Sequence, residues 1–167
     1  MTVQEIKTLF AFNSWATNRI FEALEKVAEQ DYKRDLKASH GSLHGTMTHL
    51  VAAERIWLSR LVGKPETSLV TEQDLPSLGA LKTAWEDIAS RTARFVGKLD
   101  EQKLQTAFEY TTTSGKKFAN THQQILQHLV NHSSYHRGQI AAMMRQVGAE
   151  PVSTDLIAFY RHSAQNQ

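Results

Sequence analysis

Four segments of the chain carry apolar residues at helical spacing. In the first, over 3–27, apolar side chains return every three or four residues, at Ile6, Leu9, Phe10, Ala16, Ile20, Leu24 and Val27. Such a period places them along one stripe of an α-helix. Comparable patterns run over about 42–61, 77–99 and 121–148. The pattern therefore predicts four amphipathic helices.

Capping residues mark the ends of these segments. Ser77 suits the N-cap of the third helix, and Thr121 and Gln124 have the spacing of a capping box before the fourth. Gly63 suits the exit of the second helix and Gly148 that of the fourth. These signals place the boundaries within a few residues.

The connections between the helices complete the predicted fold. About fifteen residues join the second and third helices, too many for a tight turn between antiparallel neighbours, which favours a long crossover connection. β-Branched and aromatic residues on both sides of Ser114 and Gly115 predict a small hairpin. The segment 153–162 predicts a short C-terminal helix capped by Ser153 or Thr154. We expect an all-α four-helix bundle with these additions.

Length and composition fit an ordinary globular protein. The 167 residues are 41% hydrophobic and 22% charged, which suits one domain spanning 1–167. No cysteine is present, so disulfides and thiolate ligands are excluded and any metal must be held by nitrogen and oxygen. A formal net charge of +2 is too small to indicate a nucleic-acid partner.

The expected location is the cytoplasm. The first residues lack the basic stretch, apolar run and small-residue cleavage site of a secretory signal. No run of about 18 apolar residues could span a membrane. A chain without cysteine also fits a reducing compartment.

Two histidines interrupt the apolar stripe of the fourth segment. His132 and His136 lie at its centre, and residues four apart on a helix have Cβ atoms about 5–6 Å apart. A buried neutral imidazole needs both a donor and an acceptor. The pair is therefore either satisfied by hydrogen bonds in the core or shares a metal ion. His128 continues the series at the stripe's edge as a bystander or outer-shell group, and His122 is interpreted as structural.

A closed site needs a third ligand from a facing helix, as in other bundle metal sites. The second segment offers His44, His49 and Glu54. Glu54 shares a stripe with Leu50 and Leu58, whereas His49 lies on another arc, and spacing alone does not choose among them.

Several other polar residues each allow two structural interpretations. Asn13 falls inside the first apolar stripe, and Arg137 and Gln139 flank His136. They could orient a ligand or serve as outer-shell groups, or they could make ordinary hydrogen bonds within the bundle. Glu54 is the only carboxylate on the predicted inner face of its helix, and it would need the ion or a cation nearby. No residue clearly matches a general base.

Two stretches resemble the DinB and YfiT-like metalloprotein superfamily: THLVAAERIWLSRL, and LQHLVNHSSYHRGQIAAMMRQVGAEPVSTD. The resemblance covers nearly the whole chain, including FNSWATNRIF and GSLHGTMTHL. NHSSYHRGQI with its matching upstream histidine is its most specific part. The resemblance implies a four-helix bundle with a three-histidine metal site, whose ligands match His49, His132 and His136. It thus favours His49 over Glu54.

The resemblance also carries functional expectations. Members often dimerise, and some relatives are thiol-dependent S-transferases or isomerases that use bacillithiol, mycothiol or glutathione. We expect a homodimer that binds one divalent ion, zinc or nickel, and acts on a small molecule as a thiol S-transferase or hydrolase, with no catalytic residue assigned. The alternative is a non-catalytic, metal-stabilised ligand-binding or stress-response protein. Because the chain has no cysteine, any thiol must arrive with a cofactor or substrate.

Overall fold

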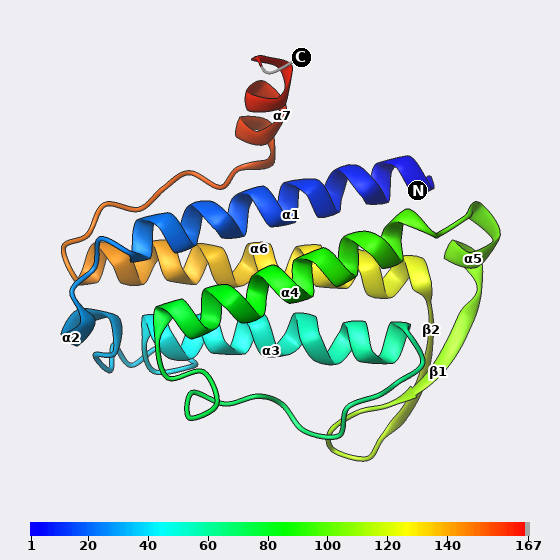
Figure 1. The fold of residues 1–167 in the computed structure, drawn as a ribbon, viewed down its shortest axis with the longest axis horizontal. Coiled ribbons are helices and arrows are strands. Elements are labelled where there is room, and N and C mark those ends of the chain that lie inside the picture. Colours follow the sequence, from blue (N-terminus) through cyan, green and yellow to red (C-terminus); the bar gives the residue numbers. More distant parts are fainter. Residues whose placement is uncertain (166–167) are drawn as a thin grey trace.

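The computed structural model describes residues 1–165 and is mostly helical (Figure 1). Its elements in chain order are α1 (Val3–Leu24), α2 (Glu29–Tyr32), α3 (Leu43–Leu61), α4 (Leu78–Gly97), α5 (Glu101–Gln105), β1 (Ala107–Thr111), β2 (Lys117–Thr121), α6 (His122–Gln146) and α7 (Leu156–Gln165). The four long helices are the four predicted from periodicity. The short helices α2 and α5 were not expected.

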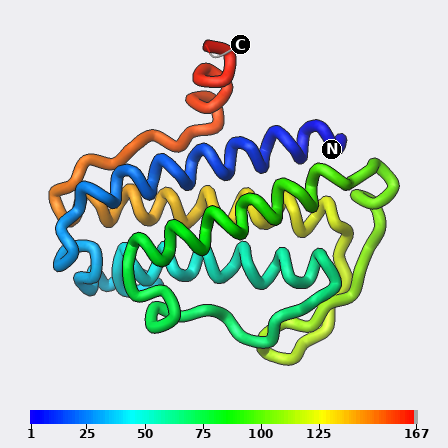
Figure 2. The backbone as a smooth tube through the Cα atoms, in the orientation of Figure 1, coloured from blue at the N-terminus to red at the C-terminus, as the bar shows by residue number. Residues whose placement is uncertain are grey.

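The four long helices pack as a bundle in which each contacts two neighbours. Helix α3 packs against α6 and α4, and α1 packs against the same two helices. Figures 1 and 2 show that α3 and α4 run in the same direction, so the chain between them returns along the whole bundle. The predicted long crossover connection is confirmed, and the seam between α3 and α6 joins antiparallel helices.

Capping chemistry sets most helix ends as expected. Ser77 accepts a hydrogen bond from the backbone of Ala80, and Thr121 forms a capping box with Gln124. The first helix ends at Leu24, three residues before the expected end, because the chain turns there towards α2. The C-terminal helix begins directly after Asp155, so the expectation that Ser153 or Thr154 caps it is wrong by one or two residues.

The remaining elements are a hairpin at one end of the bundle and a helix on the outer side of α1 (Figure 1). Strands β1 and β2 pair antiparallel around the turn at Gly115, which has a positive φ of 81°, and confirm the small hairpin. Helix α7 packs on α1, where Phe159 contacts Phe12 and Trp15. Among residues 1–165, no helix has both the length and the apolar character that a membrane crossing requires.

Candidate metal centre

The three histidines singled out from the sequence meet at the seam between α3 and α6. The Nε2 atom of His132 lies 3.2 Å from Nε2 of His49 and 3.1 Å from Nε2 of His136. His136 is buried, whereas His49 and His132 are half-buried, so the cluster opens towards solvent along the seam. The expectation that both histidines of α6 lie in the core therefore holds only for His136.

The two distances from Nε2 of His132 suit a shared metal ion. Nitrogens bound to one zinc ion at 2.0–2.1 Å in tetrahedral geometry lie about 3.3 Å apart. Hydrogen bonding among the histidines explains only one of the two short contacts of His132. Nε2 of His132 carries either one hydrogen or one lone pair, so it can make a proper hydrogen bond to only one of its two neighbours. The residues present therefore fit a divalent ion better than a hydrogen-bonded core.

A neighbouring amide fixes the ring of His136. Its Nδ1–H donates to Oε1 of Gln139 at 2.8 Å, and the amide nitrogen of Gln139 donates to the hydroxyl of Tyr135. A proton on Nδ1 leaves the lone pair on Nε2, which points at the cluster. Gln139 thus orients the ring of His136.

The surroundings keep the cluster uncharged. Burial, with the neighbouring imidazoles, lowers the pKa of His49 to about 4 and that of His132 to about 3. Burial also lowers the pKa of His136, although its bond to Gln139 opposes the effect. All three rings are therefore neutral near pH 7, which is the form that binds metals.

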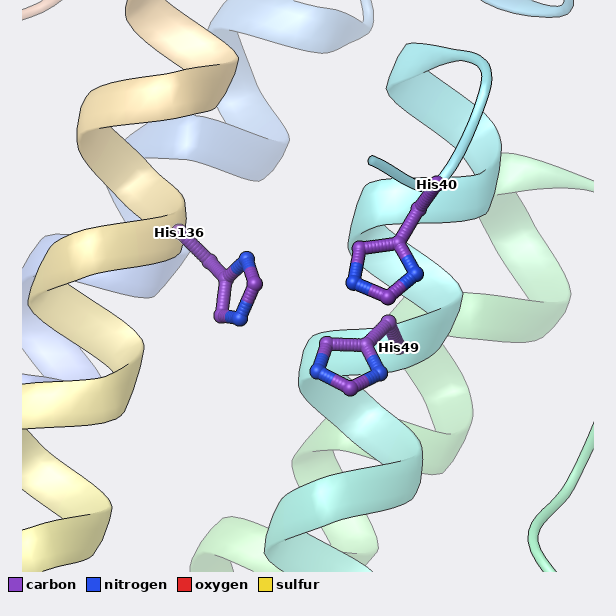
Figure 3. A group of neighbouring side chains, drawn as sticks. All are labelled: His40, His49 and His136. Atoms are coloured by element: carbon purple, nitrogen blue, oxygen red, sulfur yellow. The ribbon is translucent and has the colours of Figure 1, made fainter. Parts of the chain in front are cut away.

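A fourth histidine, His40, borders the cluster and was not singled out from the sequence. One ring nitrogen from each of His40, His49 and His136 lies within 4.8 Å of the others (Figure 3). His40 precedes α3 in an irregular loop, where no periodicity points to it. Gly45 permits the close approach of this loop, since a Cβ there would lie 2.0 Å from the carbonyl oxygen of His40.

Two overlapping sets of three histidines thus share His49 and His136. The rings of His40 and His49 are stacked, with centroids 3.8 Å apart and planes 15° from parallel. An imidazole binds a metal in the plane of its own ring, so two stacked rings cannot both do so for one ion without turning. His40 and His49 would therefore have to turn before they could bind one ion together, although the group whose ring nitrogens all lie within 4.8 Å of one another is that of His40, His49 and His136.

The carboxylate of Glu54, which was considered as a third ligand, is hydrogen-bonded inside the bundle. Oε1 of Glu54 accepts hydrogen bonds from Nδ2 of Asn13 at 2.8 Å and from the hydroxyl of Ser133 at 2.9 Å. Asn13 in turn accepts a 2.7 Å bond from Nη1 of Arg137. Glu54 is fully buried, and burial raises its pKa even though all three neighbours oppose the effect. Asn13 and Arg137 therefore serve the hydrogen-bonded interior of the bundle.

The remaining histidines lie outside the cluster. His44 is buried, with its Nε2 2.7 Å from the carbonyl oxygen of Leu75 and its Nδ1 3.1 Å from the carboxylate of Glu72. His128 is exposed, and its ring lies 5.5 Å from that of His132, at the edge of the site. His122 contacts the carbonyl of Thr106 through Nδ1 at 2.8 Å.

Comparisons with known proteins identify a matching family, a related sequence and a similar fold. The model of the DinB family matches residues 1–167. The chain is 27% identical over 152 residues to Protein DinB of Bacillus subtilis (strain 168), with 88% of each chain covered. The crystal structure of a DinB-like protein from Bacillus cereus ATCC 10987 has a similar fold, with a TM-score of 0.68 at 18% identity, covering 91% of this chain and 97% of that one.

Proposed function

The chain belongs to the DinB family, and from that premise we propose that it binds one divalent metal ion through His49, His132 and His136 and uses it in chemistry on a small molecule. The observation that carries the proposal is the approach of three Nε2 atoms from two antiparallel helices, 3.1 and 3.2 Å apart around His132. Zinc or nickel is the proposed ion, since both accept imidazole ligands.

The proposed reaction is S-transfer from a thiol, or hydrolysis. Three neutral histidines leave coordination positions for a further ligand, and an ion so held supplies the Lewis acidity that lowers the pKa of a water or thiol ligand. The chain contributes the rest: Gln139 orients one ligand ring, and the half-buried seam admits a ligand. Since the chain has no cysteine, the thiol comes from a low-molecular-weight cofactor or the substrate.

Elemental analysis tests the metal site directly. Protein purified without added metal or an affinity tag should carry about one divalent ion per chain, and a His132→Ala/His136→Ala variant should carry none. His128→Ala is the matched control, because it removes an imidazole from the same helix outside the cluster and should keep the ion. Wild-type protein that is folded, metal-free and cannot be reloaded would refute the proposal.

A second candidate is a metal-stabilised binding protein without turnover. It is favoured by the placement of Glu54, whose carboxylate is hydrogen-bonded to Asn13 and Ser133 and not to the histidines. The two candidates differ in what metal removal does. A non-catalytic protein should lose only thermal stability, whereas the proposed enzyme should also lose thiol-dependent turnover that returns with the same ion.

The proposal extends to partners and location. A homodimer is proposed on the family resemblance, and sedimentation of the purified chain tests it. Substitutions that test the dimer interface should begin on α7, which exposes Leu156, Ile157 and Tyr160. The lack of cysteine and the small net charge agree with a cytoplasmic protein that has a small-molecule partner and no nucleic-acid partner.

A further inference from the structure

A cavity of about 580 Å³ lies where the end of α3 meets the hairpin and the start of the crossover connection. Its lining includes Arg60, Pro65, Thr67, Tyr110 and Thr112. The volume is in the range that holds a small organic ligand. None of the cluster histidines lines this cavity.

The cavity is lined by a cation without a counter-ion. Arg60 is only 9% exposed, yet among residues 1–165 its Nε has no hydrogen-bond partner and no carboxylate forms a salt bridge with it. Its guanidinium lies 4.6 Å from the ring centre of Trp57 and 5.6 Å from that of Tyr110. A buried N–H without a hydrogen-bond partner is costly, and contacts with two aromatic faces do not supply that bond. The arrangement suits an anion that arrives from outside.

Neighbouring acids do not already fill this role. Glu66 lines the same cavity, but its carboxylate accepts two hydrogen bonds from Nε of Arg55, at 3.1 and 2.8 Å. Glu109 also lines the cavity and is exposed, so water screens its charge. The N–H groups of the Arg60 guanidinium are therefore available to bind an anion.

A row of rings connects this arginine to the histidine cluster. The ring of His132 lies 5.5 Å from that of His128, which lies 5.5 Å from that of Trp57. Trp57 in turn lies 4.9 Å from Tyr110 at the cavity. These side chains are exposed or half-buried, so a ligand lying along the α3–α6 seam can contact the row.

The helix rise gives the distance between the histidine cluster and the guanidinium of Arg60. The guanidinium of Arg60 lies over Trp57, which is eight residues after His49 on α3. At 1.5 Å per residue, the cluster and the guanidinium are separated by about 12 Å along the helix axis. A small molecule of moderate length can reach both.

We propose that the Arg60 cavity binds the carboxylate of an elongated small-molecule ligand whose other end, a thiol, reaches the histidine cluster. The carboxylate is favoured because its two oxygens match the planar fork of a guanidinium. The cavity as a carboxylate site stands on Arg60 alone, whereas the thiol end rests on the proposed function.

Binding of ω-mercaptooctanoic acid and ω-mercaptooctanol to cobalt-loaded protein tests the proposal, with the thiolate-to-cobalt absorption as readout. The two compounds differ only in the carboxylate. The acid should bind at least about tenfold more tightly, as expected for a charge-assisted pair. 4-Mercaptobutanoic acid, too short to reach Arg60 and poorly suited to chelate the cobalt ion, should show no such advantage over 4-mercaptobutanol.

Variants identify the residue responsible. Arg60→Met should remove the advantage of the acid and leave the affinity of the alcohol unchanged. Arg145→Met is the control, since its Nη1 bonds the carbonyl of Ala141 on its own helix and it should keep the advantage. If Arg60→Met does not fold, Arg60→Lys, which keeps the charge but loses the fork, should retain only part of it. Equal affinities of acid and alcohol in the wild type would overturn the proposal.

A separate measurement distinguishes this inference from the proposed function. If no thiol binds the cobalt ion, the thiol chemistry fails, but octanoate can still be titrated into metal-free protein by calorimetry. Binding of octanoate that octanol does not share and that Arg60→Met abolishes would support the carboxylate site. No octanoate binding would refute it.

Discussion

Replacing Arg137 by methionine should severely destabilise the fold, because this guanidinium is buried inside the bundle. It is 1% exposed, and it donates to Asn13 at 2.7 Å, to Ser134 at 2.8 Å and to Thr17 at 3.3 Å. Through Asn13 it also faces the carboxylate of Glu54. Methionine nearly preserves the volume and removes the charge, so the change isolates the polar contribution.

The expected loss is large relative to typical substitutions. Removing one partner of a buried charge pair costs about 3–5 kcal/mol, mostly because the other group stays buried without compensation. For a chain of this size, 1 kcal/mol corresponds to about 2–4 °C in Tm. The variant should therefore melt about 6–20 °C below the wild type. Arg145→Met, exposed on the same helix, is the control and should stay within about 0.5 kcal/mol.

The penalty should also depend on pH, because burial already raises the pKa of Glu54 and loss of Arg137 would raise it further. A carboxyl whose pKa is raised by folding contributes its full stability below its unfolded pKa, and loses that contribution as pH rises through the folded value. The cost of Arg137→Met should accordingly shrink as the pH falls towards the unfolded pKa of a glutamate, about 4.3.

Urea denaturation of four proteins tests this reasoning: wild type, Arg137→Met, Glu54→Gln and the double variant. If the two charges compensate each other, the double variant should be more stable than the sum of the single losses predicts, by about 0.5–3 kcal/mol. Additive losses, or an Arg137→Met penalty below about 1 kcal/mol, would contradict the view that this pair holds the interior together.

Three further predictions concern the site. Gly45→Ala should cost about 1–3 kcal/mol of unfolding free energy and displace His40, because the new Cβ would lie 2.0 Å from its carbonyl oxygen; an unchanged urea midpoint would contradict that close contact. Metal affinity, measured by competition with a chelator, should decline only below the ordinary histidine pKa, because burial lowers the pKa of His49, His132 and His136; a decline that starts at the ordinary histidine pKa would refute this. Gln139→Ala should weaken metal binding by about 10–100-fold by freeing the ring that it orients, and an unchanged affinity would show that the amide has no such role.

Much of the fold follows from local chemistry that a single chain segment contains. Apolar periodicity gave the four long helices, and the capping residues Ser77 and Thr121 act where they were expected. The errors lie where tertiary packing decides. The first helix stops at Leu24 although its apolar pattern continues, and α7 begins after Asp155, beyond the residues expected to cap it.

In the histidine cluster too, the contact within one helix could be predicted, and the contacts between different elements could not. His132 and His136 are four residues apart on one helix, so their proximity follows from the helical repeat. The choice of His49 over Glu54 depends on how α3 is rotated against α6, and periodicity left it open. The rotation that brings His49 to Nε2 of His132 turns Glu54 inward to Asn13. His40 depends on a loop that only Gly45 lets approach the helix, a contact no helical pattern could reveal. Candidate ligands within one helix are therefore predictable from spacing, whereas candidates contributed by another helix or a loop need the packed structure or a family resemblance.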